Sequence, residues 1–189
     1  MSVATAKEVY GARENIAVLI NAKDEMDIAF TKNCTEALNL GLFANVKEGF
    51  HVISSVFEHN SIMRVLEHYK KTRNITVTYL EPENDGVLNS DDVLPFIKKD
   101  TSLIALNHAN NLIGTYNDIQ SIGKLASEKG ILFLVDAAQS IGKKQIDVQK
   151  MHIDLLCAPG HKSLFGLSGT GFIYYSKNAN KEPMLRGGT

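Results

Sequence analysis

The sequence predicts an α/β fold with three layers, in which a mostly parallel, seven-stranded mixed sheet lies between helices. Apolar, β-branched runs recur along the chain, and stretches with helical periodicity fill most of the gaps between them. Several of these runs are continuously apolar and do not alternate with polar residues, which is typical of strands buried on both faces. Strands and helices in alternation indicate a parallel sheet joined by helical crossovers.

The apolar runs give the expected strands. The last gap, residues 160–169, is too short for a crossover helix, so the seventh strand is expected to run antiparallel to its neighbour. The expected strands cover residues 27–30, 50–54, 75–80, 103–108, 131–135, 153–157 and 170–175.

Residues 117–129 give the clearest helical pattern. Asn117 can cap this helix, apolar residues recur along one face, and Gly130 ends it. Residues 90–99 fit a helix less well, because Pro95 lies inside the segment and has no backbone N–H to donate. Similar helical patterns cover residues 2–20, 35–44 and 60–71.

Length and composition indicate a single globular domain over residues 1–189. Apolar residues make up 44% of the chain, charged residues 22%, and the formal net charge is −1. This balance gives no electrostatic case for binding nucleic acid or an anionic membrane. The sequence contains neither an apolar stretch of transmembrane length nor the apolar centre of a signal peptide, so no membrane association is expected.

The two cysteines, Cys34 and Cys157, each lie inside an expected structural element. This placement favours a reducing compartment, the cytoplasm, over a disulfide framework. Cys157 and His161 are four residues apart, but no second pair of ligands accompanies them. No metal site is therefore predicted.

Two charged residues follow the most apolar strands. Lys162, in the stretch CAPGHKSLFG, is either a solvated residue of a surface turn or a desolvated amine that loses its proton easily and forms a Schiff base. Asp136 either caps a helix or pairs with a cationic partner. Ligands of open α/β sheets bind at the carboxyl ends of the strands, which is where both residues are expected.

Three further polar stretches follow expected strands. NCTE can be a plain capping motif built on Asn33, or an anion site that uses the free backbone N–H groups of Cys34 and Thr35. His59 can stack on a flat ring, although a histidine at such a position is more often structural. Asn111 suggests a polar site, but a turn rich in asparagine gives the same pattern.

The combination matches what pyridoxal 5′-phosphate requires. Asp136 would pair with the pyridinium nitrogen and keep the ring an electron sink. Lys162 would bind the aldehyde covalently and later move a proton at the α-carbon of the substrate. Asn111 or Gln139 could hydrogen-bond the ring hydroxyl. Thr35 and His161 could bind the phosphate.

Five motifs resemble those of the class V aminotransferase superfamily, in its cysteine desulfurase and selenocysteine lyase branch. They match in order and spacing over residues 27–175. The motifs are NCTEALNL, FEHNSI, NNLIGTYNDI, VDAAQSIGK and GHKSLFGLSGTGFIYY. The resemblance implies the large, pyridoxal-phosphate-binding domain of the aspartate-aminotransferase-like fold. It also implies that the full-length protein cleaves the carbon–sulfur or carbon–selenium bond of a cysteine-type amino acid.

The resemblance implies roles for individual residues. Lys162 matches the lysine that binds the cofactor, Asp136 the partner of the pyridinium nitrogen, and His59 the histidine that stacks on the ring. Pro159 departs from the family, which commonly has a serine there that donates to the phosphate. The remaining matches are Asn111 and Gln139 for the ring hydroxyl, and Cys34, Thr35 and His161 for the phosphate.

The same resemblance implies a longer chain, of which residues 1–189 are the large domain. We expect the family's N-terminal segment, and its small domain beyond the stretch RGGT, to lie outside this sequence. A small amino-acid substrate, a homodimer and a sulfur-acceptor protein are further expectations. Neither cysteine is expected to carry a persulfide, because Cys34 should face the phosphate with its backbone and Cys157 should lie in a buried strand.

Two alternatives stay open from the sequence. The cofactor motifs serve transamination, or another pyridoxal-phosphate-dependent lyase reaction on a small amino acid, as well as they serve desulfuration. A non-catalytic remnant that acts through protein contacts belongs to a different class, and it would not bind added cofactor.

Overall fold

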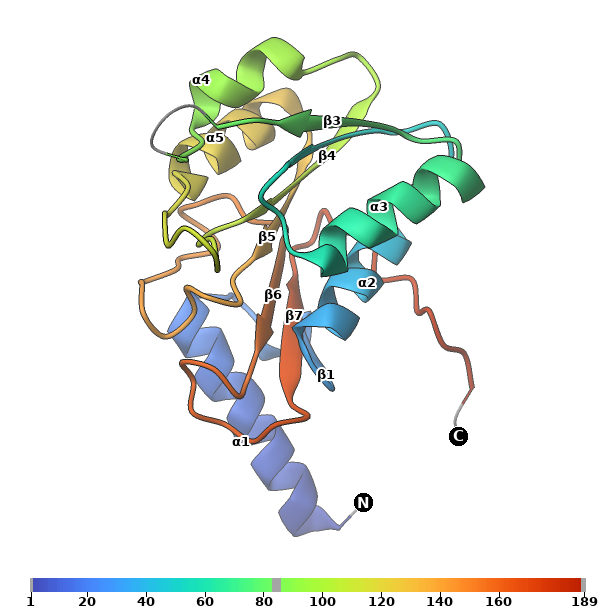
Figure 1. Cartoon of the computed structure of the whole chain (residues 1–189). Coiled ribbons are helices and arrows are strands. Elements are labelled where there is room, and N and C mark those ends of the chain that lie inside the picture. The colour runs from blue at the N-terminus through green and yellow to red at the C-terminus, as the bar shows by residue number, and fades with distance from the viewer. Residues whose placement is uncertain (1, 83–85, 188–189) are drawn as a thin grey trace.

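In a computed structural model, which describes residues 2–82 and 86–187, the chain forms one seven-stranded mixed sheet between two layers of helices (Figure 1). The last two residues of the stretch RGGT lie outside the described residues. The strands lie in the order β1-β7-β6-β5-β4-β2-β3. Their bounds are β1 (Ile28–Thr31), β2 (His51–Ser55), β3 (Thr76–Leu80), β4 (Thr101–Asn107), β5 (Leu132–Asp136), β6 (Leu155–Pro159) and β7 (Gly171–Tyr175).

The helices cover both faces of this sheet. Figure 1 shows α2 and α3 on one face and α1, α4 and α5 on the other. The helices are α1 (Val3–Ile20), α2 (Cys34–Asn45), α3 (Asn60–Thr72), α4 (Ser90–Val93) and α5 (Ile119–Lys129), with two 3-10 turns, Glu25–Asp27 and Leu94–Phe96. None of the helices in the described residues is long and apolar enough to cross a membrane.

The core divides into two apolar clusters, one on each face of the sheet. In β4, Ile104 and Leu106 pack with α1 and α5, while Leu103 and Ala105 pack with α2 and α3. All four side chains are fully buried. The middle of a strand that contributes to both clusters must be apolar at successive positions, which is why residues 103–106 do not alternate with polar residues. The predicted three-layer α/β fold is confirmed.

Strand direction brings most of the strand ends to one edge of the sheet. The strands β2 to β6 are connected by parallel pairings, and β7 runs antiparallel to β6, as the short connection predicted. Since β1 is in turn antiparallel to β7, it runs in the same direction as β6. The carboxyl ends of β1, β2, β4, β5 and β6 therefore share one edge, where the predicted site residues should gather.

Two expectations about helices are wrong. The cap of α5 is Asp118, whose side chain accepts from the Ser121 N–H, because Asn117 is occupied elsewhere: its amide donates to the Asn107 carbonyl and accepts from Leu88. The predicted helix over 90–99 ends after one turn at Val93. A 3-10 turn containing Pro95 follows it, and proline cannot continue an α-helical hydrogen-bond pattern.

The packing of α5 gives a test of the fold. A Cβ atom added at the buried Gly123 would lie 1.9 Å from the Met151 carbonyl oxygen. Backbone atoms cannot yield as a flexible side chain would, so Gly123→Ala should lower the free energy of unfolding by about 3 kcal/mol. Gly11→Ala in α1 is the matched control, because no atom lies within 4 Å of its added Cβ. Urea denaturation of both variants measures the effects, and equal stabilities would contradict the packing.

Candidate active site at the carboxyl edge of the sheet

A cavity of about 200 Å³ opens at the carboxyl edge of the sheet. Five segments line it: the start of α2, the turn before α3, the segment after β4, the end of β5 with its turn, and the turn after β6. It brings together all of the residues that the sequence predicted for the site. These are Cys34, Thr35, His59, Asn111, Asp136, Gln139, His161 and Lys162.

Asp136 is the most buried charged group in this set. It ends β5, stands in register with Asn107 of β4 and Cys157 of β6, and is 4% exposed. Its Oδ1 accepts from the Ala138 N–H at 2.8 Å. Burial raises the pKa of the Asp136 carboxyl, while the Ala138 N–H and the nearby thiol act against this rise. Residues 138–143 form turns, so Asp136 shapes a turn and does not cap an α-helix.

The Cys34 thiol, not only its backbone, faces the site. Its Sγ lies 3.5 Å from Asp136 Oδ1 and donates to it, a contact that the sequence did not predict. The reason is that α2 packs against β6 and β7, which turns its first side chain toward the end of β5. Burial, followed by the negative charge of Asp136, raises the pKa of this thiol.

The first turn of α2 offers hydrogen-bond donors to the cavity. Asn33 is the N-cap, as predicted, and accepts from the Glu36 N–H at 2.8 Å. The N–H groups of Cys34 and Thr35 precede the first intrahelical donor and point out of the helix end. Together with the positive end of the helix dipole they form an anion-binding arrangement.

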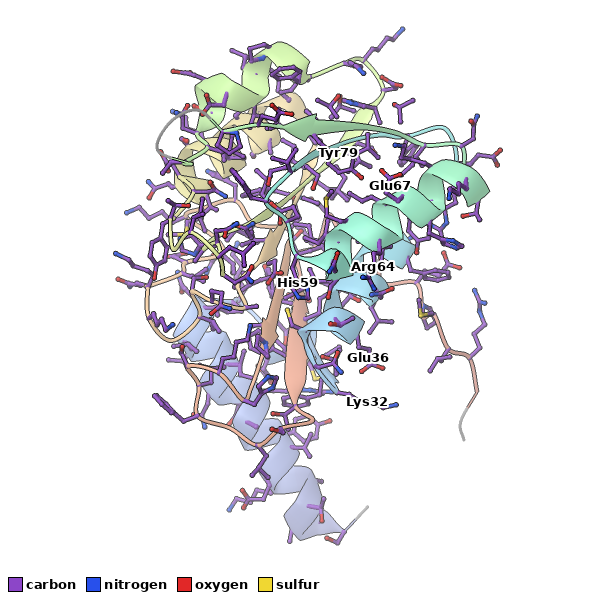
Figure 2. All side chains as sticks on the ribbon, viewed as in Figure 1. Lys32, Glu36, His59, Arg64, Glu67 and Tyr79 are labelled. Carbon is purple, nitrogen blue, oxygen red and sulfur yellow. The ribbon has the colours of Figure 1, made fainter. Side chains whose placement is uncertain are left out.

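A histidine and two hydroxyl groups at the cavity are linked by hydrogen bonds. His59 is the N-cap of α3 (Figure 2), and its Nδ1 accepts from the Ser61 N–H at 3.1 Å. This bond places the proton of the neutral ring on Nε2. The Ser61 hydroxyl lies 2.8 Å from the same Nδ1 and 2.8 Å from the Thr35 hydroxyl. The imidazole is therefore held in one orientation at the cavity.

Only one of the two adjacent asparagines after β4 faces the cavity. Asn110 is buried, and its side chain donates to the Phe57 carbonyl and accepts from the Leu112 N–H. It thereby shapes the turn that carries Asn111, which lines the cavity, as Gln139 does.

Lys162 lines the cavity but is exposed, so the expectation of a desolvated amine is wrong for this chain. The physical reason is that β6 ends at Pro159, and the chain then leaves the sheet in a turn at the open side of the cavity. Gly142 places this turn: it has φ +78°, and a Cβ there would lie 2.6 Å from the Ser163 carbonyl oxygen. A glycine at 142 is thus required for the residue after Lys162 to approach so closely.

Two polar cavity residues were missed from the sequence, Ser61 and Asn107. Asn107 ends a buried strand with a polar side chain, the same signal that identified Asp136. Ser61 follows His59 by two residues but gives no signal of its own. Across residues 2–82 and 86–187, no group of three or more His, Cys, Asp or Glu side chains is arranged to hold a metal ion.

Comparison with known proteins gives one family. The sequence model described as "Aminotransferase class-V" matches residues 1–189. Among curated relatives, the cysteine desulfurase IscS of Plasmodium falciparum is 40% identical over 95% of this chain and 33% of its own length. IscS of Pseudomonas entomophila is 40% identical over 95% of this chain and 45% of its own length. The chain thus spans less than half the length of these relatives.

Solved structures agree with the sequence comparison. A structure of "SspA in complex with cysteine" superposes with a TM-score of 0.88 at 34% identity, covering 100% of this chain and 56% of the other. The apo cysteine desulfurase of Thermococcus onnurineus NA1 superposes with a TM-score of 0.87 at 31% identity, covering 95% of this chain and 46% of the other.

Proposed function

The chain belongs to the class-V aminotransferase family, and from this premise we propose that it forms the cofactor-binding large domain of a pyridoxal-phosphate-dependent cysteine desulfurase. Enzymes of this family use pyridoxal phosphate. The observation that carries the proposal is the meeting of a buried aspartate, an exposed lysine and a helix N-terminus around one cavity.

Asp136 fits the nitrogen of the cofactor ring. Its Oδ1 has two donors, whereas Oδ2 accepts no hydrogen bond from the described residues. A buried carboxylate with an open oxygen favours a cationic donor, because its charge is costly in a poorly solvated place. A protonated ring nitrogen is such a donor. When bound, pyridoxal phosphate supplies a ring that withdraws electrons from the α-carbon of an amino acid.

The other cavity residues fit the remaining parts of the cofactor. The first-turn N–H groups of α2, with Thr35 and His161, would hold the phosphate. The fixed His59 imidazole would lie on the ring face, and Asn111 and Gln139 would donate to the ring hydroxyl. Pro159 offers no side-chain donor, so the helix end would carry more of the phosphate binding than it would with the serine that the family resemblance implies at this position.

Lys162 has the position and freedom for two tasks. Its amine reaches the cavity from a turn at the open side, where it would hold the cofactor covalently. Once released by substrate, the same amine would take and return a proton at the α-carbon as a general acid–base group. Asp136 would stay ionised throughout and keep the ring nitrogen protonated.

Cysteine is the proposed substrate. The relatives at 40% identity are named cysteine desulfurases, and one structural neighbour was solved with cysteine. The cavity residues above bind the cofactor and do not by themselves select the reaction. In the full-length enzyme, assayed with cysteine and a thiol reductant that releases the transferred sulfur as sulfide, alanine with sulfide would support desulfuration. A keto acid that keeps the sulfur would point to transamination, and pyruvate with ammonia and sulfide to another elimination.

We also propose a homodimer, a sulfur-acceptor protein and a cytoplasmic location. Exposed apolar side chains near Lys162 support the dimer: Phe165 is 93% and Leu167 80% exposed in this chain. A persulfide-forming enzyme needs an acceptor for its sulfur. Cys34 and Cys157 are both free thiols, which suits a reducing compartment.

Removing the Asp136 carboxylate should remove most of the activity. In the full-length enzyme, Asp136→Ala should lower kcat for cysteine by about 10³, since a pre-arranged charge partner contributes about 4 kcal/mol to transition-state stabilisation. Asp154→Asn is the matched control, because Asp154 is also buried but lies at the opposite edge of the sheet. Steady-state sulfide production, with a thiol reductant in the assay, measures both variants. Near-normal turnover of Asp136→Ala would show that the carboxylate only shapes the turn.

Neither cysteine of this chain should be the sulfur carrier. Burial raises the pKa of Cys157, and burial and Asp136 raise that of Cys34, so both are protonated at neutral pH and poor nucleophiles. In the full-length enzyme, Cys34→Ala and Cys157→Ala should each keep sulfide release within about tenfold of the wild-type rate, whereas loss of a nucleophile costs about 10³ or more. A loss of that size in either variant, with the protein folded, would identify that cysteine as the carrier.

A further inference from the structure

Glu58 is a buried acid beside the cavity with no part in the function proposed above. It is 8% exposed and directly precedes His59 in the turn between β2 and α3. Its Oε1 accepts from the Ser55 hydroxyl at 2.7 Å and from the Asn107 side-chain amide at 3.1 Å. Its Oε2 is buried and has no hydrogen-bond partner in the described residues.

The contact with Asn107 connects this turn to the cavity wall. Asn107 lines the cavity and stands in register with Asp136. Its Nδ2 donates to Glu58 and to the Phe57 carbonyl, while its Oδ1 accepts from the Asn117 amide at 3.3 Å. The donors and acceptors around Asn107 thus allow one orientation of its amide. Glu58 and Phe57 tie the turn before His59 to the end of β4.

The surroundings of Glu58 favour its neutral form. Burial raises the pKa of its carboxyl to about 8, against the hydrogen bonds from Ser55 and Asn107, and the charge of Asp136 adds to the rise. The groups that face it are the Ser55 hydroxyl from β2, the Asn107 amide from β4 and the Asp136 carboxyl from β5. A neutral Glu58 leaves Asp136 as the negative charge of the site, and an unpaired O–H is cheaper to bury than an unpaired anionic oxygen.

Resting on the proposed function, we propose that Glu58 is a positioning residue: as a neutral acid it fixes the 55–59 turn to the end of β4 and so holds the His59 ring at the cavity. It touches neither the cofactor nor the substrate. It affects cofactor binding by way of His59. Because Glu58 is neutral, it does not compete with Asp136 for the ring nitrogen.

Cofactor binding tests the positioning role. Added pyridoxal phosphate is titrated by absorbance into wild type, Glu58→Gln, Glu58→Ala and the exposed control Glu48→Gln. Glutamine keeps the acceptor and the shape of the neutral acid, so its Kd and that of Glu48→Gln should stay within about threefold of wild type. Glu58→Ala should bind at least about tenfold more weakly.

A double-mutant cycle separates positioning from general structural damage. In a His59→Ala background, Glu58→Ala should weaken binding by less than about threefold, because the residue through which it acts is already gone. A full tenfold effect in that background would overturn the proposal. So would wild-type affinity in Glu58→Ala.

The pH dependence of stability tests the neutral form without any cofactor. A carboxyl whose folded pKa lies above its unfolded value stabilises the fold fully below pH 4.5, and this contribution is lost as pH rises toward 8. Relative to Glu58→Gln, the melting temperature of wild type should therefore fall by at least about 4 °C between pH 5 and pH 9. Asp136→Asn measures separately the part that comes from the second buried carboxyl.

The binding experiment and the melting experiment together distinguish a failure of the proposed function from a failure of the positioning role. If wild type binds no pyridoxal phosphate, the proposed function fails, and with it the positioning role. The melting curves then still decide whether Glu58 is neutral. If wild type binds cofactor but its melting temperature follows that of Glu58→Gln at every pH, Glu58 is ionised in the fold and this inference is wrong.

Discussion

The chemistry at the carboxyl edge of the sheet depends on one buried carboxylate. Asp136 ends the middle strand, with β4 and β6 on either side, and is 4% exposed. Such a charge is unfavourable unless donors or cations surround it. The Ala138 N–H and the Cys34 thiol satisfy one oxygen. Asp136 lines a cavity together with Lys162 and the N-terminus of α2, an arrangement that suits the proposed ligand, which has a cationic ring donor and an anionic group.

The topology explains why such distant residues meet. Two antiparallel pairings, β6 with β7 and β7 with β1, return β1 to the direction of the parallel strands. The start of α2 therefore lies at the same edge as the turns that follow β2, β4, β5 and β6. Within that edge, buried amides set the shape: Asn107 and Asn110 both donate to the Phe57 carbonyl, which fixes the turn carrying His59. The same turn places Glu58 against Asn107.

Strand positions, the antiparallel last strand and most of the polar cavity residues were predictable, because buried strands are continuously apolar and functional groups follow their carboxyl ends. Tertiary contacts decided the rest. Asn117 has the right type for a cap, but its amide bridges Asn107 and Leu88, and Asp118 caps α5 instead. The exposure of Lys162 depends on the path of its turn, and the direction of the Cys34 thiol on the packing of α2. No sequence pattern identifies Glu58 as a buried acid, because its burial depends on its contact with Asn107, which is far away in the sequence.

We propose that Lys162 and Asp136 together hold pyridoxal phosphate in one cavity. The most direct measurement is borohydride reduction of the cofactor-treated protein, followed by digestion and peptide mass mapping. We expect a pyridoxyl adduct on Lys162, with the yield strongly reduced in Asp136→Ala and unchanged in Lys124→Arg, a variant of an exposed lysine of α5. An adduct on Lys143 or Lys144, or none on any lysine, would contradict it.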